Sequence, residues 1–230
     1  MLIFDNVTLR VGDFTLTADA HVGPGLTAVI GPSGGGKSTL LSAIAGFLDT
    51  AAGQIAWDGR DLSGRAPGDR PVTMLFQDNN LFPHLTVAQN VGLALGPRLR
   101  MSAAETSRIA DVLRRVGLGD LGRRKPAALS GGQQSRAALA RVLLADLPVV
   151  LLDEAFAALG PALRAEMLEL VHRTLVQAGR TVLMVTHDPS DARAWADQVI
   201  LVADGVVQPP RPASALFADP PAALRAYLGT

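Results

Sequence analysis

The sequence has no cysteine and no excess of charge of either sign. The absence of cysteine excludes a disulfide framework and thiolate metal sites, and it fits a reducing compartment. Lysine and arginine together number 21, and so do aspartate and glutamate. No global basic field therefore favours an anionic membrane surface or nucleic acid, and we expect no nucleic-acid partner.

Long apolar runs are missing too. No run approaches the roughly 18 residues of a membrane-spanning helix, and the N-terminal residues do not follow the pattern of a signal peptide. We expect a cytosolic chain that works at a membrane only where another subunit supplies the spanning helices. With 230 residues, 48% of them hydrophobic, the sequence fits one globular domain with a subdomain.

A glycine-rich loop follows the apolar run 26–30 and leads into an apolar helical pattern. Its spacing, Gly-x-x-x-x-Gly-Lys-Ser, is that of a phosphate-binding loop. Glycines let the backbone N–H groups point inward, while the helix that begins near Lys37 adds the positive end of its dipole. Lys37 can reach phosphate oxygens and Ser38 can ligate Mg²⁺, whereas a plain glycine turn needs neither residue. The predicted phosphate-binding residues are Gly31, Ser33, Gly34, Gly36, Lys37, Ser38 and Thr39.

Polar side chains also stand directly after three other apolar runs. They are Gln77, Asp153, Glu154 and His187. Ligands of open α/β sheets bind beyond the carboxyl ends of the strands, where the glycine loop lies as well. Beside a phosphate loop, two adjacent carboxylates divide naturally into an acid linked to Mg²⁺ and a base for water. Gln77 is placed to touch a bound ion or water, although a single glutamine is more often a solvated loop residue.

The segment Leu129-Ser-Gly-Gly-Gln133 precedes another long helical pattern. Ser130 and Gln133 have the spacing of a capping box, so a well-capped helix is one interpretation. Two consecutive glycines at the first helical positions, Gly131 and Gly132, cost roughly 1 kcal/mol each relative to alanine. Their presence suggests that something approaches the backbone closely. A helix N-terminus with a serine hydroxyl then forms a second anion site.

Strands and helices alternate over most of the chain, which predicts an α/β fold. Residues 2–9 and 14–22 alternate apolar and polar around a turn, which predicts an antiparallel hairpin at a sheet edge. Phe14, next to that turn, could stack on a nucleobase or simply belong to the core.

The character of the sequence changes from about residue 84 to 130. Capping boxes at Thr86 and Ser102 each open an amphipathic pattern, and no strand pattern intervenes. We therefore predict a helical subdomain at about 84–130 inserted into a core of residues 1–83 and 131–230. Apolar positions near its start could form a partner surface or pack inside the subdomain. They include Leu81, Phe82 and Leu85.

In this order, the motifs resemble the ATP-binding subunits of ABC transporters across essentially the whole chain. The matching stretches are the Walker A loop Gly31–Ser38, the Q-loop Gln77, the signature Leu129–Gln133, the Walker B run Val149–Glu154 and the switch histidine His187. The resemblance implies a P-loop NTPase (RecA-like) core with an antiparallel β edge subdomain, an inserted α-helical subdomain, and ATP with Mg²⁺ as cofactors.

The resemblance also implies a mechanism that uses two copies of the chain. They face head to tail, and the serine and glycines of one signature close over the γ-phosphate held by Lys37 of the other copy. Glu154 polarises the attacking water, and His187 contacts the γ-phosphate. Asp153 and Gln77 serve the Mg²⁺ shell, together with Ser38. Further implied partners are a membrane-spanning permease and, indirectly, a periplasmic solute-binding protein.

Three positions depart from the family pattern. The D-loop after Walker B, Ala157–Gly160, lacks the usual serine and aspartate, which puts communication between the two sites in question. The usual A-loop tyrosine corresponds to Val11, which leaves Phe14 as the candidate for stacking on adenine. Gln134 stands where an arginine is common.

Several features point to a bacterial importer at the cytoplasmic face of the inner membrane. They are the segment Leu81–Thr86 after the Q-loop, the lack of fused membrane spans and the lack of an additional regulatory domain. More narrowly, the segments 45–48 and 74–90 look like those of thiamine importers. ATPases of other small-solute importers, for iron, polyamines or molybdate, and of exporters such as those for lipoprotein release, remain alternatives.

Overall fold

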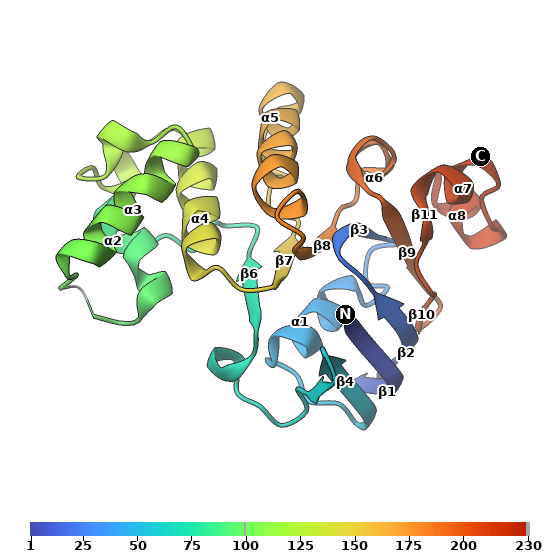
Figure 1. The fold of residues 1–230 in the computed structure, drawn as a ribbon. Helices are drawn as coiled ribbons and strands as arrows, with labels where there is room; N and C mark the ends of the chain where they lie inside the picture. The colour runs from blue at the N-terminus through green and yellow to red at the C-terminus, as the bar shows by residue number, and fades with distance from the viewer. Residues whose placement is uncertain (99, 229–230) are drawn as a thin grey trace.

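The computed structural model describes residues 1–98 and 100–228, and its strands lie in one mixed sheet flanked by helices (Figure 1). The strand order is β5-β4-β1-β2-β10-β9-β3-β8-β7-β6, with β11 paired to β9. The strands are β1 (Leu2–Val11), β2 (Phe14–Val22), β3 (Gly25–Ile30), β4 (Ala52–Trp57), β5 (Arg60–Asp61), β6 (Val72–Leu75), β7 (Val149–Asp153), β8 (Thr181–Val185), β9 (Gln198–Ala203), β10 (Val206–Val207) and β11 (Arg211–Pro212).

The part of the sheet from β9 to β6 is parallel, and its strands are buried on both faces. In β7, Val150 and Leu152 belong to one hydrophobic cluster, whereas Val149 and Leu151 belong to another on the opposite face. Burial on both faces explains why these strands appear in the sequence as continuous apolar runs. Because the strands are parallel, their carboxyl ends lie along one edge of the sheet, as predicted for the site.

The antiparallel part forms the other end of the sheet. Strands β1 and β2 pair as the predicted hairpin, with Val11 opposite Phe14 at the turn. Their position differs from the prediction, because β4 pairs with the outer side of β1 and β10 pairs with β2. The hairpin therefore lies inside the sheet, and β5 is the outermost strand. The residues of the hairpin do not indicate which distant strands pair with it, so its position in the sheet could not be predicted from them.

Helices cover both faces of the parallel strands. They are α1 (Lys37–Ala45), α2 (Val87–Gly92), α3 (Ala103–Arg115), α4 (Gly131–Ala145), α5 (Pro161–Val171), α6 (Pro189–Trp195), α7 (Ala213–Ala218) and α8 (Ala222–Leu228). Short turns of 3-10 helix are η1 (Pro67–Asp69), η2 (Leu93–Leu95), η3 (Gly119–Leu121) and η4 (Pro126–Ala128), and α5 continues into the π-helical turn η5 (His172–Val176). Helix α1 packs on the face that the antiparallel strands share, while α4 and α5 pack on the opposite face.

The segment between β6 and α4 is helical throughout its regular elements, and Figure 1 shows α2 and α3 to one side of the sheet, next to α4. Both expected capping boxes form, at Thr86 and at Ser102. Helix α2 is shorter than its apolar pattern predicts. It ends at Gly92, and the 3-10 turn η2 follows it directly. Its buried side chains belong to the same cluster as those of α4 and β7. We retain the division into core and helical subdomain at about residues 84–130 as a proposal.

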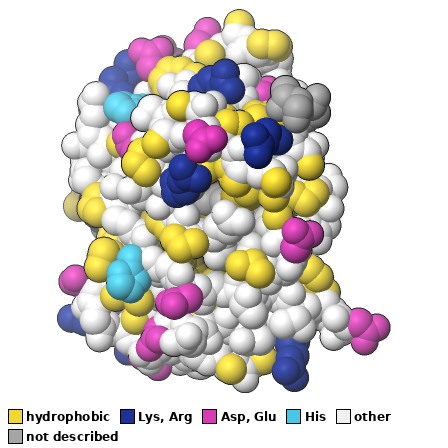
Figure 2. All heavy atoms as spheres, turned by 90° about the vertical axis from the view of Figure 1, so that its right-hand side faces the viewer, with side chains coloured by type: hydrophobic (Ala, Val, Ile, Leu, Met, Phe, Trp, Pro, Cys, Tyr) yellow, Lys and Arg dark blue, Asp and Glu magenta, His cyan; other side chains and the backbone are white. Residues whose placement is uncertain are grey.

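The surface carries no large field of one charge sign on the face that bears α7 and α8. Figure 2 shows basic and acidic side chains interspersed with hydrophobic ones over this face. Among the described residues, no helix combines the length and the apolar character needed to cross a bilayer.

Candidate functional site

The phosphate-binding loop runs from the end of β3 to the start of α1. Gly34 and Gly36 have φ values of +73° and +101°, which strain any residue with a Cβ. At Gly31 a Cβ would lie 2.0 Å from the Val202 carbonyl oxygen, so only glycine fits. No side chain caps α1, whose N-cap residue is Gly36. The first N–H groups of the helix are thus left to bind an anion.

Lys37 folds back over this loop. Its Nζ donates hydrogen bonds of 2.8 Å to the carbonyl oxygens of Gly31 and Pro32. The residue is only 8% exposed, and burial lowers the pKa of its ammonium group, while Glu154 and Asp153 oppose that shift. A cation is therefore held inside the glycine loop, where phosphate oxygens would replace the two carbonyls as its partners.

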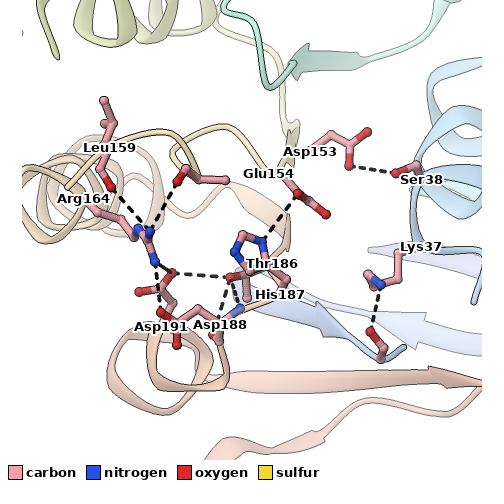
Figure 3. Close-up of polar contacts among 12 residues, drawn as sticks. Lys37, Ser38, Asp153, Glu154, Leu159, Arg164, Thr186, His187, Asp188 and Asp191 are labelled. Atoms are coloured by element: carbon pink, nitrogen blue, oxygen red, sulfur yellow. Dashed lines mark hydrogen bonds and ion pairs between the residues drawn. The ribbon is translucent and has the colours of Figure 1, made fainter. Parts of the chain in front are cut away.

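Ser38 and Asp153 meet at the carboxyl edge of the sheet (Figure 3). The Ser38 hydroxyl donates a 3.1 Å hydrogen bond to Oδ1 of Asp153, the last residue of β7. Burial raises the pKa of Asp153, whereas the bond from Ser38 lowers it. A hydroxyl and a carboxylate are the oxygen ligands that Mg²⁺ accepts. The described residues include no group of three or more His, Cys, Asp and Glu side chains arranged for a metal. This pair would therefore leave the rest of the ion's shell to water and phosphate oxygens.

Glu154 and His187 face one another beside this pair (Figure 3). Nδ1 of His187 lies 3.5 Å from Oε2 of Glu154, and both side chains are partly exposed to solvent. Glu154 has a φ of +47°, an uncommon conformation for a residue with a side chain. Its N–H donates a 3.2 Å hydrogen bond to the Val185 carbonyl of the neighbouring strand. The strained backbone turns the carboxylate off the strand axis toward the histidine.

Gln77 is exposed and follows β6, whose Leu75 pairs with Leu152 of β7. It thus lies at the same sheet edge as Asp153, but no hydrogen bond joins it to the other site residues that the structure describes. The two residues after Asp78 have positive φ values, and Arg141 of α4 donates to their carbonyl oxygens. The Q-loop is therefore fastened to the helix that carries the signature.

The signature residues form the expected capping box. Oγ of Ser130 accepts from the Gln133 N–H at 3.3 Å, and Oε1 of Gln133 accepts from the Ser130 N–H at 3.0 Å. Gly132 is buried, and a Cβ there would lie 2.5 Å from Leu163, whereas Gly131 is exposed with open space beside it. Figure 1 shows that the C-terminal end of α4 leads to the sheet. The N-terminal end of α4 points away from the sheet. No hydrogen bond or ion pair in the described chain connects this segment to the phosphate loop.

Phe14 lies beneath the phosphate loop. It is half-buried, and a Cβ placed on Gly36 would come within 3.0 Å of its ring. Val11, at the family's usual A-loop position, is half exposed. The ring of Phe14 thus supports the backbone that would hold the phosphates, and its role toward a base stays a prediction.

Two side chains that contact the site were not predicted from the sequence. Tyr227 of α8 donates a 2.9 Å hydrogen bond to the carbonyl oxygen of His187. Arg164 of α5 contacts both the segment after Glu154 and the segment after His187. Neither residue lies next to a motif, and only the folded chain brings them there. Gln134, noted as a departure, donates to the carbonyl oxygens of Pro126 and of Leu129, the first residue of the signature.

Comparison with known proteins decides the family. The family described as ABC transporter matches residues 18–157. The chain belongs to the ABC transporter family. The thiamine import ATP-binding protein ThiQ of Cereibacter sphaeroides is 63% identical over 230 residues, which cover all of both chains. The chain is accordingly an ATP-binding subunit that hydrolyses ATP in an ABC transporter, as predicted.

Solved structures of the family have the same fold. The cbiO1 protein of Clostridium perfringens, part of the ABC transporter complex cbiONQ, is 26% identical and matches with a TM-score of 0.82 over 95% of this chain and 90% of its own. A dimeric ATP-binding cassette in a post-hydrolysis state with ADP and Pi is 29% identical, with a TM-score of 0.76 over 93% of this chain and 99% of its own. The ABC ATPase fold predicted from the motifs is thus confirmed.

Proposed function

We propose that this ABC transporter ATPase powers the import of thiamine or a phosphorylated thiamine. The observation that carries the proposal is full-length similarity to proteins named for thiamine import, at 63% identity in Cereibacter sphaeroides and 57% in Ruegeria. No part of the described chain forms a solute cavity in a membrane, so the solute would be selected by other subunits. The cytoplasmic face of a bacterial inner membrane is the location that this role requires.

ATP binding would use the loop from Gly31 to Thr39. Its backbone N–H groups and Lys37 would hold the phosphates, and its glycines lack the Cβ atoms that would hinder their approach. Ser38 and Asp153 would hold Mg²⁺, which supplies charge neutralisation on the phosphates when it is bound. Gln77 would join that shell from the neighbouring strand end.

Hydrolysis would use the pair of Glu154 and His187. Glu154 accepts a proton from the attacking water, and its uncommon backbone conformation holds the carboxylate at the strand end. His187 contacts the γ-phosphate and, at 3.5 Å from Glu154, keeps the carboxylate from turning away. Both side chains are open to solvent on one side, as access for water and nucleotide requires.

A second copy of the chain would complete each site. The signature segment Ser130–Gln133 has the form of an anion site, yet no hydrogen bond or ion pair joins it to the phosphate loop of its own copy among the described residues. Facing copies head to tail would bring each signature to the γ-phosphate of the other. The dimeric state of the related cassette with ADP and Pi supports this arrangement.

The permease would dock on an apolar groove near the Q-loop. Its lining includes Met74, Phe76, Leu81, Phe82 and Arg141, and the ring of Phe47 lies 6.2 Å from that of Phe76. Phe47 and Phe82 are 60% and 49% exposed, respectively. Leu85 is buried and belongs to the interior packing instead. Large exposed rings beside a groove are typical of a protein interface.

The test is reconstitution of the complete transporter. The chain would be purified with its membrane subunit, incorporated into liposomes with the periplasmic binding protein, and assayed for ATPase activity with candidate solutes. We expect stimulation by thiamine or its phosphates and none by iron, spermidine or molybdate. A complex assembled with Glu154→Gln provides the background rate. Stimulation by one of the other solutes alone would overturn the thiamine proposal and leave the ATPase assignment intact.

A further inference from the structure

Arg164 binds four groups beside the site through its two terminal amino groups, while its buried Nε has no hydrogen-bond partner among the described residues. It lies in the first turn of α5, and its side chain is only 15% exposed. One amino group lies 3.0 Å from Oδ2 of Asp188 and 3.5 Å from Oδ2 of Asp191. The other donates to the carbonyl oxygens of Ala157 and Leu159, at 3.4 Å each. One planar cation therefore contacts two separate segments at once (Figure 3).

These two segments flank the reacting groups. Ala157–Leu159 begins three residues after Glu154, beyond the end of β7. Asp188 is the residue after His187, beyond β8. Because Glu154 and His187 face each other at 3.5 Å, the position of each depends on the segment that follows it. Arg164 connects those segments on the side away from the phosphate loop, as Figure 3 shows.

The segment after His187 has further bonds of its own. The Asp188 N–H donates to the Thr186 hydroxyl at 3.0 Å, and the Asp188 carboxylate caps α6 by accepting from the Ser190 N–H at 2.9 Å. The Thr186 hydroxyl also donates to Asp191 at 3.4 Å. Arg164 thus binds a segment that already has a defined shape, and a rigid segment transmits position to His187.

Among the described residues, the segment after Glu154 has hydrogen bonds only between backbone groups and to Arg164: the Ala157 N–H donates to the carbonyl oxygen of Glu154, and the Leu159 N–H donates to that of Phe156, each at 3.0 Å. The D-loop residues Ala157 to Gly160 have no polar side-chain atoms, and Gly160 starts α5 without a side-chain cap. Arg164 adds the hydrogen bonds from a side chain, to the carbonyl oxygens of Ala157 and Leu159. The serine and aspartate that are usual in the family are absent from this loop. Arg164 is the side chain of the described residues that hydrogen-bonds to it.

Other ion pairs in the described chain differ from this one. Arg136 with Glu166 and Arg98 with Glu105 each involve one carboxylate and at least one well-exposed partner. Exposed pairs of this kind contribute little to stability. Removing a half-buried cation that serves two carboxylates has a larger effect, because both carboxylates lose their counter-charge.

We propose that Arg164 is a positioning residue for ATP hydrolysis, which ties the D-loop to the segment of the switch histidine and so keeps Glu154 and His187 in register. In this proposal it acts through those two residues. The proposal rests on the roles proposed above for Glu154 and His187, and it is independent of the solute transported.

The test is a set of variants of the full chain, assayed for ATP turnover, for affinity toward a non-hydrolysable ATP analogue, and for thermal stability. Arg164→Met removes the positive charge. Arg164→Lys keeps the charge but lacks the two terminal amino groups of the guanidinium, which bind the two segments. Arg180→Met is the control, because Arg180 pairs with the exposed Asp146 and contacts no site segment. Small misplacements at an active site can cost about 10²-fold in rate. We expect Arg164→Met to lower kcat about tenfold or more, with affinity for the analogue within about twofold of the original.

A double-mutant cycle separates positioning from simple stability. If Arg164 acts through His187, then Arg164→Met should cost much less in a His187→Ala background than in the original chain. Arg164→Lys should recover part of the rate, and Arg180→Met should leave it unchanged. Equal losses in both backgrounds, or a kcat for Arg164→Met near the original, would overturn the proposal.

A second variant covers the case in which Arg164→Met does not fold. Asp191→Asn keeps the size of the side chain and weakens the ion pair from the opposite side. We expect a smaller loss of kcat in the same direction, and an unchanged kcat in this variant would overturn the proposal. The single variants His187→Ala and Glu154→Gln test the catalytic roles of these two residues separately. Evidence against those roles can therefore be distinguished from evidence against the positioning role of Arg164.

Discussion

The hydroxyl of Ser38 donates a 3.1 Å hydrogen bond to Oδ1 of Asp153, joining the first turn of α1 to the end of β7. The two residues are 115 positions apart in the sequence. Their contact brings the start of α1 to the carboxyl end of β7, and it places side by side the two oxygen groups that we propose as Mg²⁺ ligands. Preformed ligands reduce the cost of ordering a site when Mg²⁺ and nucleotide bind.

Asp153→Asn should separate stability from function. Burial raises the pKa of Asp153, so its ionised form is disfavoured in the fold. That cost is present above the raised pKa and disappears as the pH falls below the ordinary aspartate range. At pH 7 to 8 we therefore expect the nucleotide-free asparagine variant to unfold at the same or a higher denaturant concentration, while Mg²⁺-dependent ATPase activity falls about a hundredfold or more.

The control for this variant is Asp120→Asn, because Asp120 is exposed in the helical segment. It should leave both the denaturation midpoint and the ATPase rate unchanged. A strongly destabilised Asp153→Asn chain would contradict the inference that the buried carboxylate costs stability. A normal Mg²⁺ dependence would remove Asp153 from the metal site.

Lys37→Met should weaken nucleotide binding at least about tenfold, because it removes a charge-assisted bond to phosphate. It also leaves the carbonyl oxygens of Gly31 and Pro32 without their donor. The chain has only one other lysine, Lys125, which is exposed. Lys125→Met is therefore a matched control and should bind a fluorescent ATP analogue normally. Equal affinities in the two variants would show that Lys37 does not bind the phosphates.

Glu154→Gln should bind ATP with nearly the original affinity but hydrolyse it at least about a hundredfold more slowly. General-base catalysis is typically worth roughly 10²–10⁴-fold, and the amide cannot accept the proton from water. Single-turnover hydrolysis and equilibrium binding measure the two quantities separately. Glu169→Gln, on the exposed face of α5, is the control and should hydrolyse normally. Near-original turnover in Glu154→Gln would remove Glu154 from its role.

Phe14→Leu distinguishes base stacking from support of the loop. Stacking of a base on an aromatic ring is worth about 1–3 kcal/mol, so its loss should lower ATP affinity about tenfold or more. Inorganic triphosphate has no base, and its affinity should stay unchanged if Phe14 stacks on adenine. A parallel loss for both ligands would show that the ring acts by supporting Gly36. Phe217→Leu, on α7, removes a ring elsewhere and should change neither affinity.

Motifs with a local physical cause could be predicted from the sequence alone. The glycine loop, the capping box at Ser130 and the two carboxylates at the end of β7 each combine residue type and spacing within a few positions. Such motifs predict the folded structure well because residue type and spacing restrict the local backbone to few conformations. The same reasoning located the helical segment, since both capping boxes and their apolar faces are short-range features.

Contacts between distant segments could not be predicted in this way. The hairpin is enclosed by β4 and β10, and nothing in its own alternation indicates that. Arg164 reaches Asp188 only because α5 packs beside the loop that follows β8. Tyr227 reaches the His187 carbonyl from the last described helix. Each depends on tertiary packing, for which the local sequence has no signal.

The self-association of the chain can be tested with two serines that occupy equivalent positions. Ser130 and Ser102 both cap helices through a box with the third residue, and their Oγ atoms accept the corresponding N–H at 3.3 and 3.2 Å. Replacing either serine by alanine should cost about 1 kcal/mol of stability. In a Glu154→Gln background with ATP and Mg²⁺, only Ser130→Ala should also weaken dimerisation, because only that hydroxyl would face a γ-phosphate. Sedimentation at several protein concentrations measures the dimer. If both variants dimerise as tightly as their parent, the signature does not seal the site; if both lose the dimer equally, the loss reflects stability and not recognition.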